Sequence, residues 1–584
     1  MFKLFKNFTK KDYFLILSCI VLIVAQVWLD LKLPDYMSAI TRLVQTENNT
    51  MGEILKQGSY MLLCAFGSLT SAIIVGYLAS KLSANFSLNL RSKIFKKVSL
   101  FSLEEMKKFQ TSSLITRTTN DVTQIEMLIS MGLQMLIKAP IMAFWAISKI
   151  LDKSFELSML TFGCVLVLLI TIITLMIIVL PRFEKVQKLI DKVNGVMREN
   201  LTGIRVIRAF NAEEFQQDRF ENVNKTLTDN QLFNQRCFSI LNPVMSLVMH
   251  GLTLGIYFIG AILIEKAGFL DKITIFSNVV VFSSYGMQVI MSFLMLAMIF
   301  MIWPRAQVSA RRINEILDCN ISIKDGDVKN GTSVGTVEFK NVSFKYPDAM
   351  EYILEDISFK VNKGETVAFI GSTGSGKSTL INLVPRFYDV TLGEVLVDGV
   401  NVKDYEQYSL NNKIGYVSQK AVMFTGSILD NVRYGDSGTD ITIDKIKEAI
   451  DVAQGTEFVS KMSDTYKSHI SRGGTNISGG QKQRLSIARA IAKSPEIYIF
   501  DDSFSALDYK TDLTLRTELK KYTKDATCLI VAQRIGTIMN ADKIIVLDKG
   551  KCVGIGTHKE LLKNCEVYKQ IALSQLSKEE LENA

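Results

Sequence analysis

The first half of the chain contains long stretches without charged residues, and these stretches limit its fold more than any other feature. Five stretches carry no Asp, Glu, Lys or Arg, namely Tyr13–Leu29, Gln57–Ser80, Leu157–Pro181, Cys237–Ile264 and Ile273–Pro304. A sixth, from about Met127 to Ser148, is interrupted by Lys138. Because roughly 17–25 apolar residues cross a bilayer as a helix, this series predicts six transmembrane helices rather than the buried helices of a soluble core.

Basic residues indicate how these helices are oriented. Lysines precede the first stretch, and segments 81–126 and 182–236 are rich in Lys and Arg, whereas segments 36–56 and 265–272 have few; Lys149 and Lys153 are exceptions. Since basic loops stay in the cytoplasm, both termini and both long segments are expected there. The formal net charge of +9 then reflects membrane topology, and no nucleic-acid partner is expected.

Cysteine and histidine usage argues against a structural metal. The eight cysteines form no CxxC pair, and the chain has three histidines, so neither a disulfide framework nor a zinc site is predicted. No small-residue cleavage pattern follows the first apolar stretch, so no signal peptide is expected.

The second half has a different pattern and carries a phosphate-binding motif. Strand-like residues from Val337 to Tyr346 (VEFKNVSFKY) precede a second strand-like run, GETVAFI, which leads directly into GSTGSGKST, Gly371 to Thr379. In a strand–glycine loop–helix unit of this kind, backbone N–H groups surround phosphates, the lysine reaches the terminal phosphates and the hydroxyl binds magnesium. We therefore predict an α/β domain with a largely parallel sheet that binds a nucleoside triphosphate and Mg²⁺.

Two further motifs narrow this class. ISGGQ lies at Ile477–Gln481, and IYIFD lies at Ile497–Asp501, where an apolar run ends in a carboxylate. Together with the phosphate loop they resemble the ATP-binding cassette of ABC transporters, in which the ISGGQ-type signature closes over the nucleotide of a facing cassette. The resemblance covers almost the whole chain. It implies a half-transporter of the exporter type in the cell membrane.

The expected fold class follows from this resemblance. It is an α-helical six-helix transmembrane domain with long cytoplasmic helical loops, fused to an α/β P-loop nucleotide-binding domain, the ABC cassette. The expected boundaries are 1–318 for the transmembrane domain, 319–334 for a linker and 335–584 for the cassette.

The resemblance also implies roles for individual residues around ATP and Mg²⁺. Tyr346 would stack on adenine, although a strand-edge tyrosine is the alternative. The ATP-binding loop comprises Gly371, Ser372, Thr373, Gly374, Ser375, Gly376, Lys377, Ser378 and Thr379. The magnesium contacts would be Ser378, Gln419 and Asp501. The signature residues Ser478, Gly479, Gly480 and Gln481 would face the partner's ATP, and Asp508 belongs to the D-loop that crosses between cassettes.

Two positions depart from the active pattern of the family. Asp502 stands where the family has the glutamate that polarises the attacking water, and Gln533 stands where a histidine contacts the γ-phosphate. Both changes affect the hydrolytic machinery, where small displacements are costly. The chain thus most resembles the degenerate-site subunit of heterodimeric multidrug exporters of Gram-positive bacteria. A second ABC half-transporter is the expected partner, and a catalytically active homodimer is the alternative.

The long cytoplasmic segments are expected to be helices that extend below the bilayer and turn at the ATPase. Thr111–Asp121 and Arg208–Phe215 resemble the coupling-helix regions of ABC exporters and are the predicted turns. Solvated loops are the alternative, but unstructured loops of this length are uncommon.

The membrane half offers candidates for the transport pathway. Met287, Met291, Met295 and Met298 share one side of the sixth helix and would line a substrate cavity or else pack against neighbours and lipid. Asp35 is a candidate outer gate or a solvated interfacial residue, and Lys138 is ionisable within a span.

The expected substrate is a small hydrophobic or amphipathic compound, with drugs favoured and lipids or peptides as the alternative. The six spans exclude a soluble cassette ATPase, and fusion of both domains disfavours an importer. A gated channel on the same scaffold stays a separate hypothesis.

Overall fold

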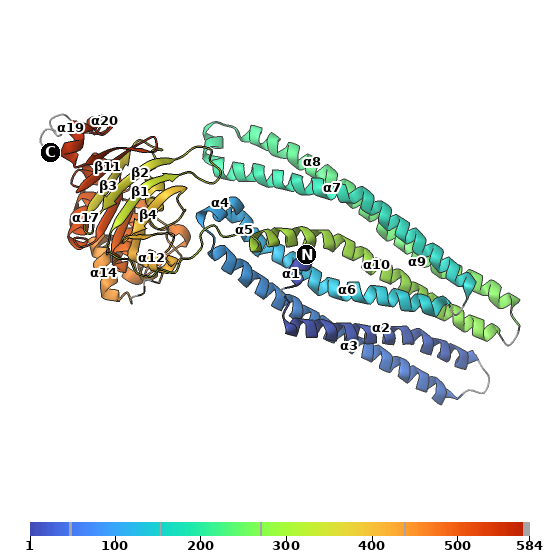
Figure 1. Ribbon diagram of the computed structural model, residues 1–584. Coiled ribbons are helices and arrows are strands. Elements are labelled where there is room, and N and C mark those ends of the chain that lie inside the picture. Colours follow the sequence, from blue (N-terminus) through green and yellow to red (C-terminus); the bar gives the residue numbers. More distant parts are fainter. Residues whose placement is uncertain are drawn as a thin grey trace. The chain divides into compact units, whose positions relative to one another are not determined.

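The computed structural model describes residues 1–6, 8–45, 50–151, 154–268, 271–436, 438 and 440–575. The chain divides into two compact units (Figure 1). The first unit comprises Met1–Ser99 and Ser112–Cys319, and the second comprises Leu100–Thr111 and Asn320–Ala584. Each unit is therefore described by itself.

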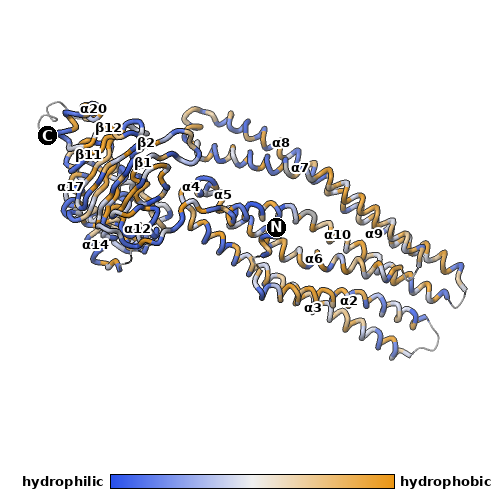
Figure 2. The backbone as a smooth tube through the Cα atoms, in the orientation of Figure 1, coloured by the Kyte–Doolittle hydropathy of each residue, from blue (hydrophilic) through white to orange (hydrophobic). Residues whose placement is uncertain are grey.

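The first unit consists of long helices. After the short α1 (Phe2–Phe5), its members are α2 (Lys10–Gln45), α3 (Met51–Ser99), α5 (Thr111–Thr118), α6 (Asn120–Leu151), α7 (Phe155–Ala209), α8 (Glu213–Ser239), α9 (Leu241–Lys266) and α10 (Lys272–Leu317). With α5–α6 and α8–α9 each counted as one span, six helical segments are long and apolar enough to cross a membrane. The six predicted spans are thereby confirmed, and Figure 2 shows their apolar stretches in orange.

These helices share an apolar core and leave other apolar surface uncovered. Buried side chains of α2, α3, α6, α7, α9 and α10 form this core, among them Val27, Leu252 and Phe282. In contrast, Phe144 and Ile177 are largely exposed. Exposed apolar side chains on helices of this length are what a protein surrounded by lipid requires.

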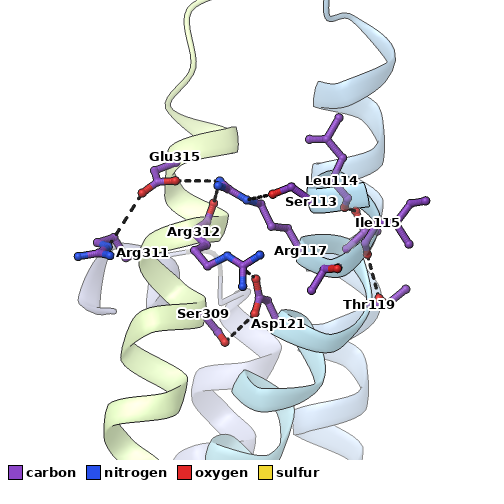
Figure 3. Close-up of polar contacts among 12 residues, drawn as sticks. Ser113, Leu114, Ile115, Arg117, Thr119, Asp121, Ser309, Arg311, Arg312 and Glu315 are labelled. Carbon is purple, nitrogen blue, oxygen red and sulfur yellow. Dashed lines mark hydrogen bonds and ion pairs between the residues drawn. The ribbon is translucent and has the colours of Figure 1, made fainter. Parts of the chain in front are cut away.

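A polar cluster joins the start of α6 to the end of α10 (Figure 3). The Asp121 carboxylate is buried; it accepts a hydrogen bond from Ser309 Oγ (2.9 Å) and lies 3.3 Å from Arg312 Nε. Arg117 of α5 donates to the backbone oxygen of Arg312 (2.7 Å) and to Glu315 (2.9 Å). Because a buried carboxylate is costly unless paired, these contacts hold the two helix ends together.

Of the two predicted cytoplasmic turns, the position of the first, Thr111–Asp121, is wrong, and that of the second, Arg208–Phe215, is confirmed. The chain reverses between α3 and α5 through α4 (Leu103–Phe109), so Thr111–Asp121 already lies in α5 and the start of α6. The reason is a capping box at Ser102 and Glu105, which starts a new helix at Leu103 instead of at the expected Thr111. The other reversal occupies the residues between the end of α7 at Ala209 and the start of α8 at Glu213, within the predicted Arg208–Phe215.

The second unit is built on two main sheets. An antiparallel sheet has the order β2 (Leu354–Val361), β1 (Val337–Phe344), β4 (Leu392–Val397) and β5 (Val400–Asn401). A six-stranded sheet has the order β12 (Lys551–Gly556), β11 (Lys543–Asp548), β3 (Thr366–Gly371), β10 (Thr527–Val531), β9 (Ile497–Asp501) and β6 (Ile414–Val417). All its neighbours are parallel except β11 and β12. A short pair, β7 (Gly426–Ser427) and β8 (His469–Ile470), completes the set.

Helices of the second unit pack around these sheets. They are α11 (Lys377–Asn382), α12 (Gln407–Lys413), α13 (Ile428–Val432), α14 (Ile443–Val452), α15 (Thr456–Ser460), α16 (Gly479–Lys493), α17 (Tyr509–Tyr522), α18 (Ile535–Ile538), α19 (His558–Asn564) and α20 (Glu566–Leu573). The predicted α/β domain with a largely parallel sheet is confirmed. Because β3, β9 and β10 are parallel neighbours, the segments that follow them meet at one edge of the sheet.

Candidate functional site

The glycine-rich loop connects the end of β3 to α11. Gly376 has φ 94°, and a Cβ there would lie 2.7 Å from Leu354 Cδ2 and 3.1 Å from the carbonyl oxygen of Ile353. A side chain at this position would therefore be both strained and crowded. This requirement explains the glycine immediately before Lys377.

The Lys377 ammonium lies inside this loop. Its Nζ donates to the carbonyl oxygens of Gly371 (2.8 Å) and Ser372 (2.7 Å), and the residue is 8% exposed. Burial lowers the pKa of Lys377, while Asp502 and Asp501 oppose that shift. A buried cation surrounded by loop backbone fits a phosphate ligand, because a phosphate would satisfy the charge that burial leaves poorly solvated.

Asp501 and Ser378 come together where a magnesium ion would be expected. Ser378 Oγ donates to Asp501 Oδ1 at 2.7 Å. Burial raises the pKa of Asp501, the neighbouring Asp502 adds to the rise, and the Ser378 hydrogen bond opposes it. A hydroxyl and a carboxylate are the hard oxygen donors that Mg²⁺ prefers, so this part of the predicted magnesium set fits the ion. Gln419, the third member, contacts the adjacent carboxylate of Asp502 instead.

The two positions that depart from the family pattern contact each other. Gln533 Nε2 donates to Asp502 Oδ2 at 2.9 Å, and Gln419 Nε2 donates to the same oxygen at 3.3 Å. Asp502 has φ 46°, in the left-handed region, and its N–H bonds the carbonyl oxygen of Val531 at 3.0 Å. Burial raises the pKa of Asp502, whereas hydrogen bonds from Gln419 and Ser505 oppose the rise.

Tyr346 is held beside the loop by its hydroxyl and by aromatic neighbours. The hydroxyl lies 3.1 Å from Thr379 Oγ1, and the ring makes edge contacts with Phe344 and Tyr388. Lys107 of α4 places its Nζ 4.5 Å from the centre of the Tyr346 ring. We did not predict this cation–π contact, because no local signal in the sequence links α4 to the segment after β1, more than two hundred residues away.

The signature residues form the start of α16 rather than part of the phosphate loop. Ser478 Oγ accepts the N–H of Gln481 (3.3 Å), and Gln481 Oε1 accepts the N–H of Ser478 (2.8 Å), which is a complete capping box. Within the described ranges, no hydrogen bond or ion pair joins Ser478, Gly479 or Gly480 to the loop 371–379. Asp508 caps α17 by accepting the N–H of Thr511 at 3.0 Å.

The methionine side of α10 lies outside the apolar core of the described helices. Tyr285 and Val289 of the same helix belong to that core. Met287 and Met295 are half-buried, whereas Met291 and Met298 are 44% and 49% exposed. Met287 and Met295 are thus partly packed within the chain, and helix packing, lipid contact and a transport cavity all stay predictions.

Asp35 is paired in the structure. Lys149 Nζ lies 3.0 Å from Asp35 Oδ2, and the hydroxyl of Tyr285 donates to Oδ1 at 2.7 Å. Lys138 lies 3.3 Å from Asp30 Oδ2. Asp30 and Tyr285 were missed in the sequence, because the rotation of each helix decides which polar side chains meet.

Comparison with known proteins defines the class. The family model described as ABC transporter transmembrane region matches residues 14–308, and the family model described as ABC transporter matches residues 354–505. The chain therefore belongs to the ABC transporter family. A solved structure of a bacterial Atm1-family ABC exporter with ATP bound has the same fold, with a TM-score of 0.81, 23% identity and coverage of 97% of this chain and 98% of that one.

Curated relatives extend across both domains. A putative multidrug export ATP-binding/permease protein, YgaD of Bacillus subtilis, is 32% identical over 85% of this chain and 84% of its own length. An ATP-dependent lipid A-core flippase of Haemophilus influenzae is 30% identical, with 86% and 85% covered. The chain is thus a multi-pass membrane protein of the ABC exporter class, with its ATPase domain in the cytoplasm.

Proposed function

We propose that this chain exports hydrophobic or amphipathic compounds, drugs among them, as one half of a heterodimer whose ATP site on this side is degenerate. The observation that carries the proposal is the 2.9 Å hydrogen bond from Gln533 to Asp502. It ties together the two residues that replace the glutamate and histidine of active family members.

The chemistry of this pair supports slow hydrolysis at the chain's own site. Aspartate is one methylene shorter than glutamate, and Oδ2 of Asp502 already accepts hydrogen bonds from Gln419 and Gln533. A carboxylate that stops about 1 Å short of the attacking water costs on the order of a hundredfold in rate. The neutral amide of Gln533 also cannot supply the positive charge of an imidazolium to a γ-phosphate.

ATP binding itself remains fully supported by the residues present. The loop 371–379, with Lys377 buried inside it, supplies phosphate contacts, and Ser378 and Asp501 supply oxygen ligands for Mg²⁺. Magnesium would neutralise phosphate charge at this position. We expect this site to hold ATP for long periods and to act as a hinge between the cassettes.

The intact signature supports a partner with an active site. Its capping box fixes the first turn of α16, so the N–H groups of Gly479 and Gly480 are available to a γ-phosphate bound by a second cassette. The partner would then be a second half-transporter that retains glutamate and histidine. Hydrolysis at that composite site would reset the transporter after each outward opening.

The test compares variants of the purified chain with variants of the reconstituted pair. Asp502→Ala should lower the turnover of the pair modestly, whereas replacing the partner's catalytic glutamate should nearly stop it. The chain alone should hydrolyse ATP slowly. Vigorous hydrolysis by the chain alone that Asp502→Ala abolishes would instead establish an active homodimer.

Lipid export is the second candidate, and the relation to a lipid A-core flippase favours it. The two candidates differ in what stimulates the ATPase in vesicles. Drug export predicts stimulation by several unrelated dyes, and Met291→Ala or Met295→Ala should change their ranking. Lipid export predicts stimulation by one lipid class and indifference to the dyes.

A further inference from the structure

A polar cluster lies among the membrane helices, where α2, α3, α6 and α10 meet. Lys138 Nζ of α6 lies 3.3 Å from Asp30 Oδ2 of α2. Ser68 of α3 donates a hydrogen bond to Asp30 Oδ1, and Gln288 Nε2 of α10 lies 3.4 Å from the backbone oxygen of Asp30. Ionised groups within apolar helices are costly to keep, so such a cluster is a candidate functional site.

The sequence places this cluster within the membrane-spanning part of the helices. Lys138 stands near the middle of the apolar stretch from Met127 to Ser148, and Asp30 directly follows the uncharged stretch that ends at Leu29. The side chains of Lys138 and Asp30 nevertheless stay 20% and 19% exposed. A ligand in the membrane half could therefore reach them without unfolding the helix packing.

The two charges of the pair are not equally satisfied. Both oxygens of Asp30 have a partner, since Ser68 bonds one and Lys138 faces the other. An ammonium has three N–H donors, and within the described ranges Asp30 is the sole hydrogen-bonding or ionic partner of Lys138. At 3.3 Å this contact is longer than a charge-assisted hydrogen bond of about 2.7–2.9 Å. Lys138 thus has capacity for a second anion.

The side-chain amide of Gln288, next to this pair, also has an unused hydrogen-bond acceptor. Gln288 Oε1 is buried, and no hydrogen-bond partner for it exists among the described residues. A buried amide oxygen without a partner is unfavourable, because burial removes its water without replacing the hydrogen bond. A hydroxyl or an acidic proton on a ligand would remove that cost.

The second lysine pair in the same unit provides a contrast. Lys149 lies at 3.0 Å from Asp35, and Tyr285 bonds the other oxygen of Asp35 while also lying 3.0 Å from the backbone oxygen of Leu31. Lys149 also stands in the last turn of α6, where a cation is favoured by the helix end. This pair has an evident structural role, so Lys149 is the matched control for Lys138.

We propose that Lys138 forms an ionic subsite that binds the phosphate or carboxylate group of an anionic amphipathic substrate, with Asp30 holding the ammonium between substrates. This inference rests on the proposed export function and narrows its substrate class. An anion binds by taking the unused donors of Lys138, while Ser68 keeps Asp30 in place. The apolar body of the same molecule would lie against the surrounding helices.

The test uses three lipids with the same acyl chain, namely lysophosphatidic acid, lysophosphatidylcholine and monoacylglycerol. A carboxylate dye and its methyl ester form a second pair that is not a lipid, and inorganic phosphate controls for free anion. Binding of labelled lysophosphatidic acid to the purified full-length chain is measured first. Stimulation of the ATPase in phosphatidylcholine vesicles, with the partner subunit present, is measured separately.

The expected result is a binding preference for the anionic head group that depends on Lys138 and not on Lys149. Wild-type protein should bind lysophosphatidic acid about tenfold more tightly than monoacylglycerol, a factor that corresponds to roughly 1.4 kcal/mol. Lys138→Met should remove this preference and leave monoacylglycerol binding unchanged, whereas Lys138→Arg and Lys149→Met should keep it. Asp30→Asn should tighten anion binding, because it removes the competing carboxylate.

Other outcomes separate the two proposals. The subsite would be overturned by equal loss of binding for all three lipids in Lys138→Met. It would also be overturned if the wild type bound the three lipids with equal affinity and also bound the carboxylate dye and its methyl ester with equal affinity. If Lys138→Met does not fold, Asp30→Asn decides, since weaker anion binding in that variant also overturns it. Head-group-selective binding without any ATPase stimulation or transport would keep the subsite and overturn the export function. A dye effect without a lipid effect would assign the subsite to anionic drugs.

Discussion

The phosphate-loop side and the signature side of the same cassette differ in how completely they keep the pattern of an active ATPase. At the phosphate loop, Ser378 bonds Asp501. Asp502 and Gln533, which stand where the family has glutamate and histidine, bond each other. At the signature, Ser478 and Gln481 form a complete capping box. This contrast underlies the proposal that the chain keeps nucleotide binding on both sides and has slower hydrolysis on one.

Removing the lysine of the phosphate loop should have the largest effect on this comparison. Lys377→Ala deletes a buried charge that is expected to pair with phosphate, and loss of one partner of a buried charge pair costs about 2–5 kcal/mol. We therefore expect this site to lose ATP affinity by about a thousandfold. Photolabelling with an ATP analogue checks this, with Lys363→Ala on the exposed turn after β2 as control. Undiminished labelling of Lys377→Ala would contradict the assignment of the loop.

Restoring the hydrolytic pair should produce the next largest effect, in the opposite direction. Asp502→Glu combined with Gln533→His returns the longer carboxylate and the imidazole to positions that already contact each other. The rate of ATP hydrolysis at this site should rise by about a hundredfold, which is the factor given above for a carboxylate that stops short of the attacking water. Single-turnover release of phosphate measures it in the complex whose partner glutamate is replaced. An unchanged rate would overturn the proposal that Asp502 and Gln533 slow hydrolysis at this site.

Weakening the signature should lower the activity of the partner's site and not ATP binding on this side. Ser478→Ala removes the N-cap of α16 and costs about 1 kcal/mol of helix stability, so the N–H groups of Gly479 and Gly480 lose their fixed direction. Turnover of the proposed heterodimer should fall by about tenfold, whereas ATP retention at the Lys377 site should not change. Thr442→Ala, which removes the same kind of cap from α14, is the matched control. Equal effects of the two variants would show a general loss of stability.

The smallest expected effect is a pH dependence of folding stability that arises from Asp501. The pKa of Asp501 is raised by burial in the folded state, so the folded protein binds a proton more readily than the unfolded chain and loses stability as pH rises above the ordinary aspartate pKa. Asp501→Asn should therefore raise the unfolding temperature without Mg²⁺ by about 2–4 °C near pH 7, and the gain should shrink toward about pH 4. Mg²⁺ should narrow the difference, because the ion favours the ionised carboxylate. A gain that is constant across pH would exclude this cause.

Much of the ATP site could be predicted from the sequence because its geometry is local. The glycine loop, Lys377 and Ser378 are contiguous, and Asp501 ends a strand parallel to the one that precedes the loop. Residues at the carboxyl ends of parallel strands share an edge, so contact between Ser378 and Asp501 follows from the pattern. The six spans were equally predictable, since length and apolar composition alone define them.

The membrane polar contacts could not be predicted in the same way. Lys138 was noticed as a charge within a span, but its partner Asp30 lies more than one hundred residues away. The pairing depends on the rotation of α2 and α6 about their axes, and apolar composition does not specify that rotation. The error in the first cytoplasmic turn has a different cause. The sequence itself carries the Ser-x-x-Glu pattern of a capping box at Ser102 and Glu105, and this pattern marks the earlier helix start.

The contact of Lys107 with Tyr346 has a practical consequence. The compact unit that contains the cassette is discontinuous in sequence, since it includes Leu100–Thr111 as well as the residues from Asn320 onward. A cassette expressed from residue 335 onward would lack α4, and the face of the Tyr346 ring that Lys107 covers would be open to solvent. Nucleotide affinities measured on such a fragment would therefore reflect a changed environment of Tyr346, the predicted adenine contact, so binding experiments on this transporter require the full-length chain.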